Sequence, residues 1–182
     1  PQKAVENAIP EIVNAIDQIT LKLQSNGKLF YIGTGTSGRL GILDASECPP
    51  TFCTNPDLVQ GIIAGGVASL TRSSESLEDV SEMAISDLKY RKFSNRDVLI
   101  GITASGRTPY VLGALKYSKS INALTISISS VPRIDSNLHN DIDIRLITGP
   151  EILAGSTRLK AGSATKMALN IISTSVMIKL GK

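Results

Sequence analysis

The chain has 182 residues, which is enough for one domain with a sizeable hydrophobic core. Apolar residues make up 42% and charged residues 19%, as is ordinary for a globular protein. The net charge of +3 is too small to favour a nucleic-acid partner, and the absence of Trp argues against a surface for stacking bases.

The N-terminal segment predicts an amphipathic helix over residues 4–25, which Asn26-Gly27 ends. Its apolar side chains recur at helical spacing, at Val5, Ile9, Ile12, Val13, Ile16, Ile19 and Leu23. The short apolar run LFYIG (29–33) ends in glycine and is typical of a buried strand. We expect the next helix to begin at Ser37.

Strands and helices then alternate along the chain. We expect further strands over 58–66, 98–103, 123–129 and 142–148, and helices over 77–88, 109–117 and 155–180. This alternation is typical of β-α-β units, so we predict an α/β fold in which helices cover both faces of a five-stranded parallel sheet. The longest apolar segment, ALNIISTSVMIKL, is too short to span a bilayer, so no membrane partner is expected.

The stretch YIGTGTSGRLG (31–41) admits two interpretations. Its glycines match the G-x-G-x-x-G pattern of a dinucleotide-binding turn. Its hydroxyls, on Thr34, Thr36 and Ser37, would instead line a cradle for a single phosphate. A dinucleotide site also needs an acidic residue at the end of the following strand, about 20 residues further on. Asp57 has that spacing but precedes the strand, which argues for the phosphate.

The same pattern returns in LIGITASGRTP (99–109), where Ser105-Gly106-Arg107 repeats Ser37-Gly38-Arg39. Each copy lies where a predicted strand ends and a helix begins, at the edge where open parallel sheets bind ligands. Glycines allow a ligand to approach closely, and helix N-termini attract anions. The repeat therefore predicts a phosphate site between two loops, with Thr108 capping the second helix ahead of Pro109.

The sequence offers little for a metal. Cys48, Cys53 and His139 are too few for a structural zinc site, which usually takes four Cys or His ligands. Two cysteines without a sign of pairing, and an N-terminus without a signal-peptide pattern, favour the reducing cytoplasm.

Two hydroxyl-rich loops of this kind, GTGTS and TASGRT, resemble those of the sugar isomerase (SIS) domain, a phosphosugar-binding, flavodoxin-like three-layer α/β/α sandwich. The resemblance becomes narrower in YIGTGTSGRLGILDASECPPTF, GIIAGG and GPEILAGSTRLKAGSATKMALNIIST, which are similar to the N-acetylmuramic acid 6-phosphate etherase family. It covers essentially the whole chain, as one SIS domain over 1–182. Members of that family continue further, so we expect the chain to lack their C-terminal helical part.

The resemblance implies a cytoplasmic lyase of peptidoglycan recycling that works as a homodimer without a cofactor. It would cleave the lactyl ether of N-acetylmuramic acid 6-phosphate by elimination and then hydration. Glu47, in ASECPPTF, matches the family's proton donor, and Glu78, in SLEDVSE, matches its second glutamate, the base at C2. A base and an acid suffice because the aldehyde acidifies the C2 proton while the ether oxygen needs a proton to leave.

The binding residues complete the expected site. For the phosphosugar we expect, from the two loops and the segment after the fifth strand, Thr36, Ser37, Gly38, Ser105, Gly106, Thr108 and Glu151. In that site Glu151 would contact the sugar or a partner subunit. Two alternatives stay open: a regulator that binds phosphosugars without catalysis, like the related glucokinase regulatory protein, and an aldose–ketose isomerase with the same C2 chemistry.

Overall fold

A computed structural model of the protein describes residues 1–72, 77–132 and 140–182. In chain order the elements are α1 (Gln2–Asn7), α2 (Ile9–Gln24), β1 (Leu29–Gly33), α3 (Gly35–Phe52), β2 (Val59–Ile63), the short 3₁₀ helix η1 (Gly66–Leu70), α4 (Ser81–Tyr90), β3 (Val98–Ile102), α5 (Pro109–Ser120), β4 (Leu124–Ser129), β5 (Ile142–Arg145) and α6 (Lys160–Lys179). The prediction of an α/β fold with five parallel strands is confirmed. His139, the one histidine, lies outside the described residues.

The sheet has the strand order β2-β1-β3-β4-β5, and every pair is parallel. The register places Gly33, the last residue of β1, opposite Ile102, the last residue of β3. The chain leaves β1 for one edge of the sheet and β3 for the other, so the connection order reverses between these two strands. Such a switch point is where doubly wound α/β folds bind their ligands.

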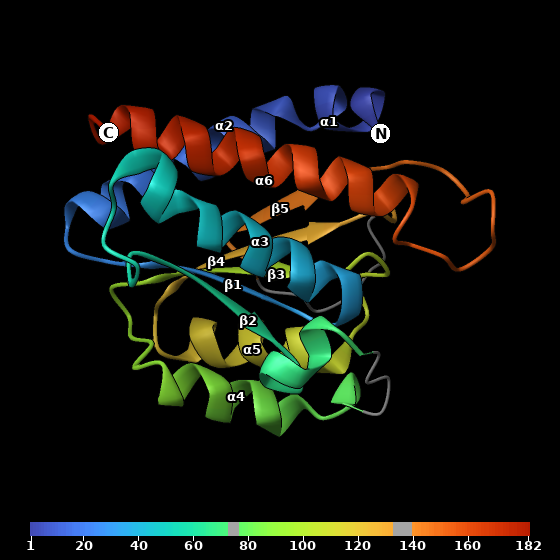
Figure 1. Ribbon diagram of the computed structural model, residues 1–182, viewed down its shortest axis with the longest axis horizontal. Helices are drawn as coiled ribbons and strands as arrows, with labels where there is room; N and C mark the ends of the chain where they lie inside the picture. The colour runs from blue at the N-terminus through green and yellow to red at the C-terminus, as the bar shows by residue number, and fades with distance from the viewer. Residues whose placement is uncertain (73–76, 133–139) are drawn as a thin grey trace.

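Helices cover both faces of the sheet, as Figure 1 shows. Helices α2, α3 and α6 pack on one face through a core that includes Tyr31 and Ile100. Helices α4 and α5 pack on the other face, where Phe30 and Leu99 are fully buried. Residues 29–32 are all buried and alternate between the two cores, which explains why β1 reads as an uninterrupted apolar run.

Several predicted boundaries were wrong. The expected helix over 4–25 is broken at Ala8, because Pro10 lacks an N–H and its ring excludes a continuous helix through this point. The second strand ends at Ile63, and η1 follows where its continuation was expected. The helix expected over 77–88 begins only at Ser81, so Glu78 precedes it, and the helix expected from Gly155 begins at Lys160.

Helix α3 continues through Pro49 and Pro50 to Phe52, although two consecutive prolines would favour a turn there. Proline is disfavoured here because each one removes a backbone donor. Packing outweighs that cost: Cys48 is buried in the core, and Phe52 packs against the same cluster. The helix therefore carries Glu47 away from the glycine loop instead of turning it back.

A buried polar network joins the sheet to two helices. The Tyr31 hydroxyl on β1 donates to Asp44 Oδ2 on α3 at 2.8 Å, and the Ser173 hydroxyl on α6 donates to Asp44 Oδ1 at 3.0 Å. Asp44 is buried. Burial raises the pKa of its carboxyl above 3.8, and the two hydrogen bonds counter only part of that increase.

We predict that Asp44 makes stability depend on pH. A raised folded-state pKa means that the stabilising contribution is fully present below pH 3.8 and is lost as the pH rises through the folded pKa. The unfolding free energy of the protein, relative to that of Asp44→Asn, should therefore fall across this interval in urea titrations.

Asp141 is the matched control. Its burial raises its pKa, but hydrogen bonds from Lys119 and Thr125 outweigh this effect and lower the pKa below 3.8. The stability difference between the protein and Asp141→Asn should accordingly rise with pH up to 3.8, the opposite slope. Parallel slopes for the two variants would contradict the assignment of Asp44.

Candidate functional site

The two Ser-Gly-Arg loops meet at the switch point of the sheet. One loop joins β1 to α3, and the other joins β3 to α5. Because β1 and β3 are hydrogen-bonded neighbours, the two loops start about 5 Å apart. Their helices leave toward opposite faces of the sheet, so both loops border the same crevice. The structure thus brings together the two repeats that the sequence places 68 residues apart.

The first loop presents backbone donors. Gly35 has a φ of +48°, which favours glycine, and it begins α3 directly after Thr34. Among the described residues, the amide N–H groups of Gly35, Thr36 and Ser37 have no acceptor, as expected for the first turn of a helix. Gly38 is buried, and a Cβ there would lie 2.6 Å from Ile63 Cγ1, so its role is to let α3 approach the sheet.

The second loop carries a cluster of hydroxyls. Thr103 Oγ1 lies 2.9 Å from Thr108 Oγ1 and 3.5 Å from Ser105 Oγ. Thr108 and Pro109 do occupy the cap and first position of α5, but the Thr108 side chain makes no capping hydrogen bond and turns to Thr103 instead. Gly106 has a φ of +69° and closes the turn. Sequence reasoning did not select Thr103, although its place directly after β3 was a usable signal.

Glu78 lies beside the first loop, and its backbone is hydrogen-bonded to α5, the helix that follows the second loop. A Cβ built on Gly35 would be 3.6 Å from Glu78 Oε1, which is van der Waals contact. The Glu78 carbonyl accepts the Tyr110 N–H at 3.0 Å, in the first turn of α5. Glu78 is half-buried. The Glu78 carboxylate, which is far from the first loop in the sequence, therefore lies beside that loop at the switch point.

Glu151 acts as the cap of α6. Its two carboxylate oxygens accept the N–H groups of Lys160 and Ala161, both at 2.9 Å. These hydrogen bonds, the one from Ala161 foremost, lower the pKa of Glu151. The next residue, Gly162, lies against Thr36: a Cβ there would be 3.6 Å from Thr36 Cγ2. Glu151 thus orders the helix start that packs on the first loop, and whether it also contacts a sugar stays a prediction.

Glu47 lies apart from the other site residues. It is exposed on α3, whereas Asp44, Ala45 and Cys48 of the same helix are buried. Twelve residues separate it from Gly35, and at about 1.5 Å of rise per residue this is roughly 18 Å of helix. Within one copy of the chain the structure does not bring Glu47 next to the Gly35–Glu78 contact.

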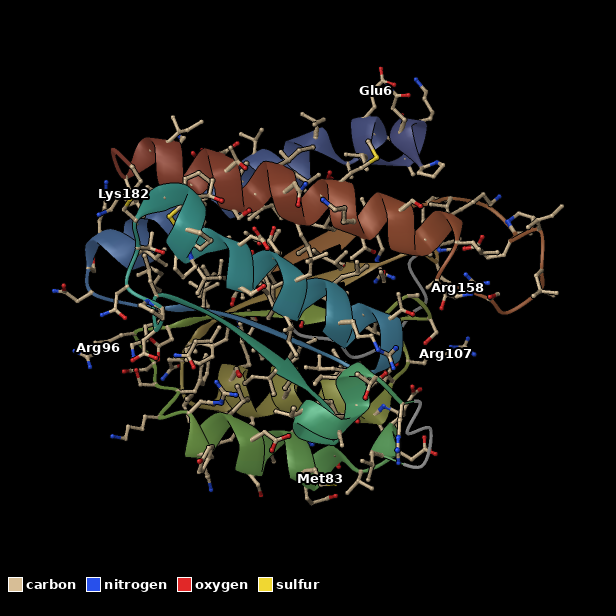
Figure 2. The ribbon with its side chains drawn as sticks, viewed as in Figure 1. Glu6, Met83, Arg96, Arg107, Arg158 and Lys182 are labelled. Atoms are coloured by element: carbon tan, nitrogen blue, oxygen red, sulfur yellow. The ribbon has the colours of Figure 1, made fainter. Side chains whose placement is uncertain are left out.

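Further polar groups lie at this end of the sheet. The hydroxyls of Ser129 and Ser130, where β4 ends, are buried and have no partner in the described part of the chain. The Ser130 N–H donates to the carbonyl of Ala104, so the end of β4 is hydrogen-bonded to the second loop. The exposed Arg107 and Arg158 lie at the same end of the molecule (Figure 2). Within the described ranges, no three His, Cys, Asp or Glu side chains are grouped so that they could hold a metal ion. None of the described helices is long and apolar enough to cross a membrane.

A switch-point crevice bordered by two glycine loops, one with clustered hydroxyls and one with first-turn amides that have no acceptor in the described ranges, fits a protein of the SIS class. The family described as the glucokinase regulatory protein N-terminal SIS domain matches residues 11–119, which include both loops and Glu78. The chain belongs to this family.

Individual relatives extend the comparison. The N-acetylmuramic acid 6-phosphate etherase of Prochlorococcus marinus strain NATL2A is 86% identical over the whole chain, which spans 59% of that relative's length. Among solved structures, a putative phosphosugar isomerase involved in capsule formation from Bacteroides fragilis superposes with a TM-score of 0.73 at 19% identity, covering 99% of this chain and 85% of its own. A phosphoheptose isomerase from Francisella tularensis superposes with a TM-score of 0.63 at 15% identity, covering 96% of this chain and 88% of its own. At this level of identity the two structures support the fold.

We predict that Gly35→Ala disables the first loop. The positive φ costs an alanine about 1–2 kcal/mol, and its Cβ would occupy the space between the loop and the Glu78 carboxylate. Affinity for a hexose 6-phosphate, measured by calorimetry, should fall at least about tenfold.

Gly66→Ala is the matched control. Gly66 has a φ of +64°, and a Cβ there would meet nothing within 4 Å. This variant should lose similar stability and keep its affinity. Equal affinities in the two variants would show that the space beside Gly35 does not form part of the binding site.

Proposed function

We propose that the chain is the SIS domain of an N-acetylmuramic acid 6-phosphate etherase. One observation carries the proposal: the Glu78 carboxylate lies beside the first glycine loop, where a Cβ on Gly35 would touch it, in a chain 86% identical to a protein of that name. The activity would release D-lactate and N-acetylglucosamine 6-phosphate. A role in peptidoglycan recycling is consistent with it, and the free thiols of Cys48 and Cys53 suit the reducing cytoplasm.

The loops would bind the phosphate. Three amide N–H groups of the first loop and the hydroxyls of Ser37, Ser105 and Thr108 are the donors that a phosphate monoester needs. Thr36 and the backbone of Gly38 and Gly106 would shape the two sides of the cradle. Neither cap residue, Thr34 or Thr108, uses its hydroxyl to cap its helix, so neither competes with a ligand for the first-turn amides.

Glu78 would then serve as the base at C2 of the open-chain sugar. It would take the C2 proton, the electron pair would form the C2–C3 double bond, and the C3–O bond to lactate would break. The leaving oxygen needs a proton, which Glu47 would donate. Water would add at C3, and C2 would regain a proton, so the sugar ends with a hydroxyl in place of the lactyl ether.

The position of Glu47 leads to a proposal about assembly. Roughly 18 Å of α3 separate it from the first loop, so it would serve a Glu78 site on a second copy of the chain. The exposed side of α3, which also carries the half-exposed Leu43, would then lie at the interface of a homodimer. A dimer with two-fold symmetry would then have two equivalent sites, each composed of Glu78 from one subunit and Glu47 from the other.

A regulatory function is the second candidate, because the matching family is named for a regulatory protein. A regulator would bind the 6-phosphosugar without exchanging its C2 proton. An isomerase would exchange that proton and yield a ketose. Release of D-lactate with solvent oxygen at C3 would identify the etherase.

We predict different defects for the two glutamates. Glu78→Gln should abolish both exchange of the C2 proton in deuterated water and lactate release. Glu47→Gln should block lactate release while C2 exchange continues, since that step needs only the base. Each loss should be about 10²- to 10⁴-fold. Full lactate release by either variant would refute its assigned role.

A subunit-mixing experiment tests the composite site. Glu47→Gln and Glu78→Gln dimers, each inactive, should regain roughly a quarter of the wild-type activity after subunit exchange. Half of the dimers are then mixed, and each mixed dimer has one site with both glutamates intact. If both residues act within one subunit, mixing restores nothing. A wild-type and Glu78→Gln mixture controls for losses during exchange.

A further inference from the structure

Tyr110 binds the Glu78 backbone from the first turn of α5. Its N–H donates to the Glu78 carbonyl at 3.0 Å. Because α5 begins at Pro109, this amide belongs to the first helical turn and has no acceptor within its own helix. The Glu78 carbonyl is therefore the acceptor on which the amide depends, and the hydrogen bond joins the glutamate directly to the helix that follows the second loop.

The Tyr110 side chain is hydrogen-bonded to α4, the helix that follows Glu78. Its ring is fully buried in the core that α4 and α5 form with the sheet, and its hydroxyl donates to Asp87 Oδ2 on α4. Burial, and then the hydrogen bond to Asp87, raises the pKa of the Tyr110 hydroxyl, so the phenol keeps its proton and remains a donor. Within the described residues the Asp87 carboxylate accepts no other hydrogen bond.

The start of α4 also packs closely on α5. A Cβ built on Gly113 would lie 2.7 Å from Ser81 Cβ and 2.8 Å from the Ser81 carbonyl oxygen, so the first residue of α4 lies directly on α5. Gly113 is about one helical turn beyond Tyr110. Residues 78–81 thus contact two successive turns of α5, and all of these residues lie in the described part of the chain.

Glu78 has no helix of its own to orient it. It lies in a turn three residues before α4 begins at Ser81. Its place beside Gly35 depends on how α4 and α5 are held together, because α4 continues the chain from Glu78 and α5 binds its carbonyl. The hydrogen bond between Asp87 and Tyr110 joins these two helices.

We infer that Tyr110 and Asp87 form a positioning pair for Glu78. Their hydrogen bond fixes α5 against α4, so that the Tyr110 N–H meets the Glu78 carbonyl and the carboxylate stays beside the first loop. The inference rests on the proposed role of Glu78 as the base. Because proton abstraction depends steeply on geometry, loosening the pair should slow C2 exchange. The phosphate donors should keep their places, since the Thr108 hydroxyl lies 2.9 Å from that of Thr103.

The experiment removes either half of this hydrogen bond in the purified protein. Tyr110→Phe loses the donor and Asp87→Leu loses the acceptor, and each should lower kcat for C2 exchange about 10- to 100-fold with KM for the phosphosugar within about threefold. The double variant should be no worse than either single variant, because both changes remove the same interaction. Asp87→Asn keeps an oxygen that can accept from the hydroxyl, so its kcat should stay within about threefold of the wild type.

Tyr117→Phe is the matched control. Tyr117 lies on the same helix and packs against the same core, but its hydroxyl makes no hydrogen bond within the described residues. This variant should match the wild type in kcat and KM. Equal kcat in Tyr110→Phe and Tyr117→Phe would overturn the inference. A raised KM at constant kcat in Tyr110→Phe would also overturn it, by assigning the residue to phosphosugar binding.

A second readout does not depend on activity. Hydrogen exchange of the amide at position 110, followed by NMR, should become at least about tenfold faster in Tyr110→Phe and Asp87→Leu, because this amide donates to the Glu78 carbonyl. It should stay unchanged in Asp87→Asn and Tyr117→Phe. A pair that only stabilised the fold would lower the urea midpoint of unfolding and leave this amide and kcat unchanged, which would refute the positioning role.

Failure of the proposed function is distinguishable. If Glu78→Gln keeps full C2 exchange, or the wild type shows none, the role of Glu78 as base falls. The amide at position 110 then still decides whether the pair positions the Glu78 backbone. Faster exchange in Tyr110→Phe and Asp87→Leu supports the positioning role, and an unchanged rate refutes it.

Discussion

The hydrogen-bonded pairing of β1 with β3 is the constraint on which the site depends. In-register parallel pairing ends both strands at the same level, with Gly33 opposite Ile102. The two loops that follow therefore begin one strand spacing apart. Because α3 and α5 then pack on opposite faces of the sheet, the loops diverge and leave a crevice between them. Pairing of β1 with any strand other than β3 on this side would separate the two halves of the phosphate site.

The two loops resemble each other in sequence but differ in how they are held. The first is the opening turn of α3, with a positive-φ glycine and three amides that have no acceptor in the part of the chain that the structure describes. The second is a turn closed by side-chain hydroxyls around the buried Thr103, six residues ahead of Pro109, where α5 begins. One loop thus offers mainly backbone donors and the other mainly hydroxyls. A phosphate between them would be bound from two sides by different chemistry.

Long-range contacts hold the rest of the site in place. Glu78 lies beside Gly35, and its carbonyl accepts the Tyr110 amide N–H. Further along α3, the Asp44 carboxylate joins β1, α3 and α6 through Tyr31 and Ser173. A buried carboxylate is costly unless its acceptors are satisfied, so this network favours one arrangement of the two helices over the sheet. The start of α6, capped by Glu151, can then pack on Thr36.

Much of the fold was predictable from local sequence, because the information is local. Buried parallel strands are short apolar runs, and the run at β1 ends in glycine, so β1 was predicted with its observed bounds. The repeated Ser-Gly-Arg identified both loops. The break at Ala8 follows from Pro10, which is a local signal. The passage of α3 through Pro49 and Pro50 was not predictable, since packing of Cys48 and Phe52 outweighs propensity there. The place of Glu78 beside Gly35, the hydrogen bonds of Tyr110 with Glu78 and Asp87, and the distance of Glu47 from the first loop depend on which strands pair and where a helix stops. Only the tertiary structure decides these, because they join residues that no spacing in the sequence relates.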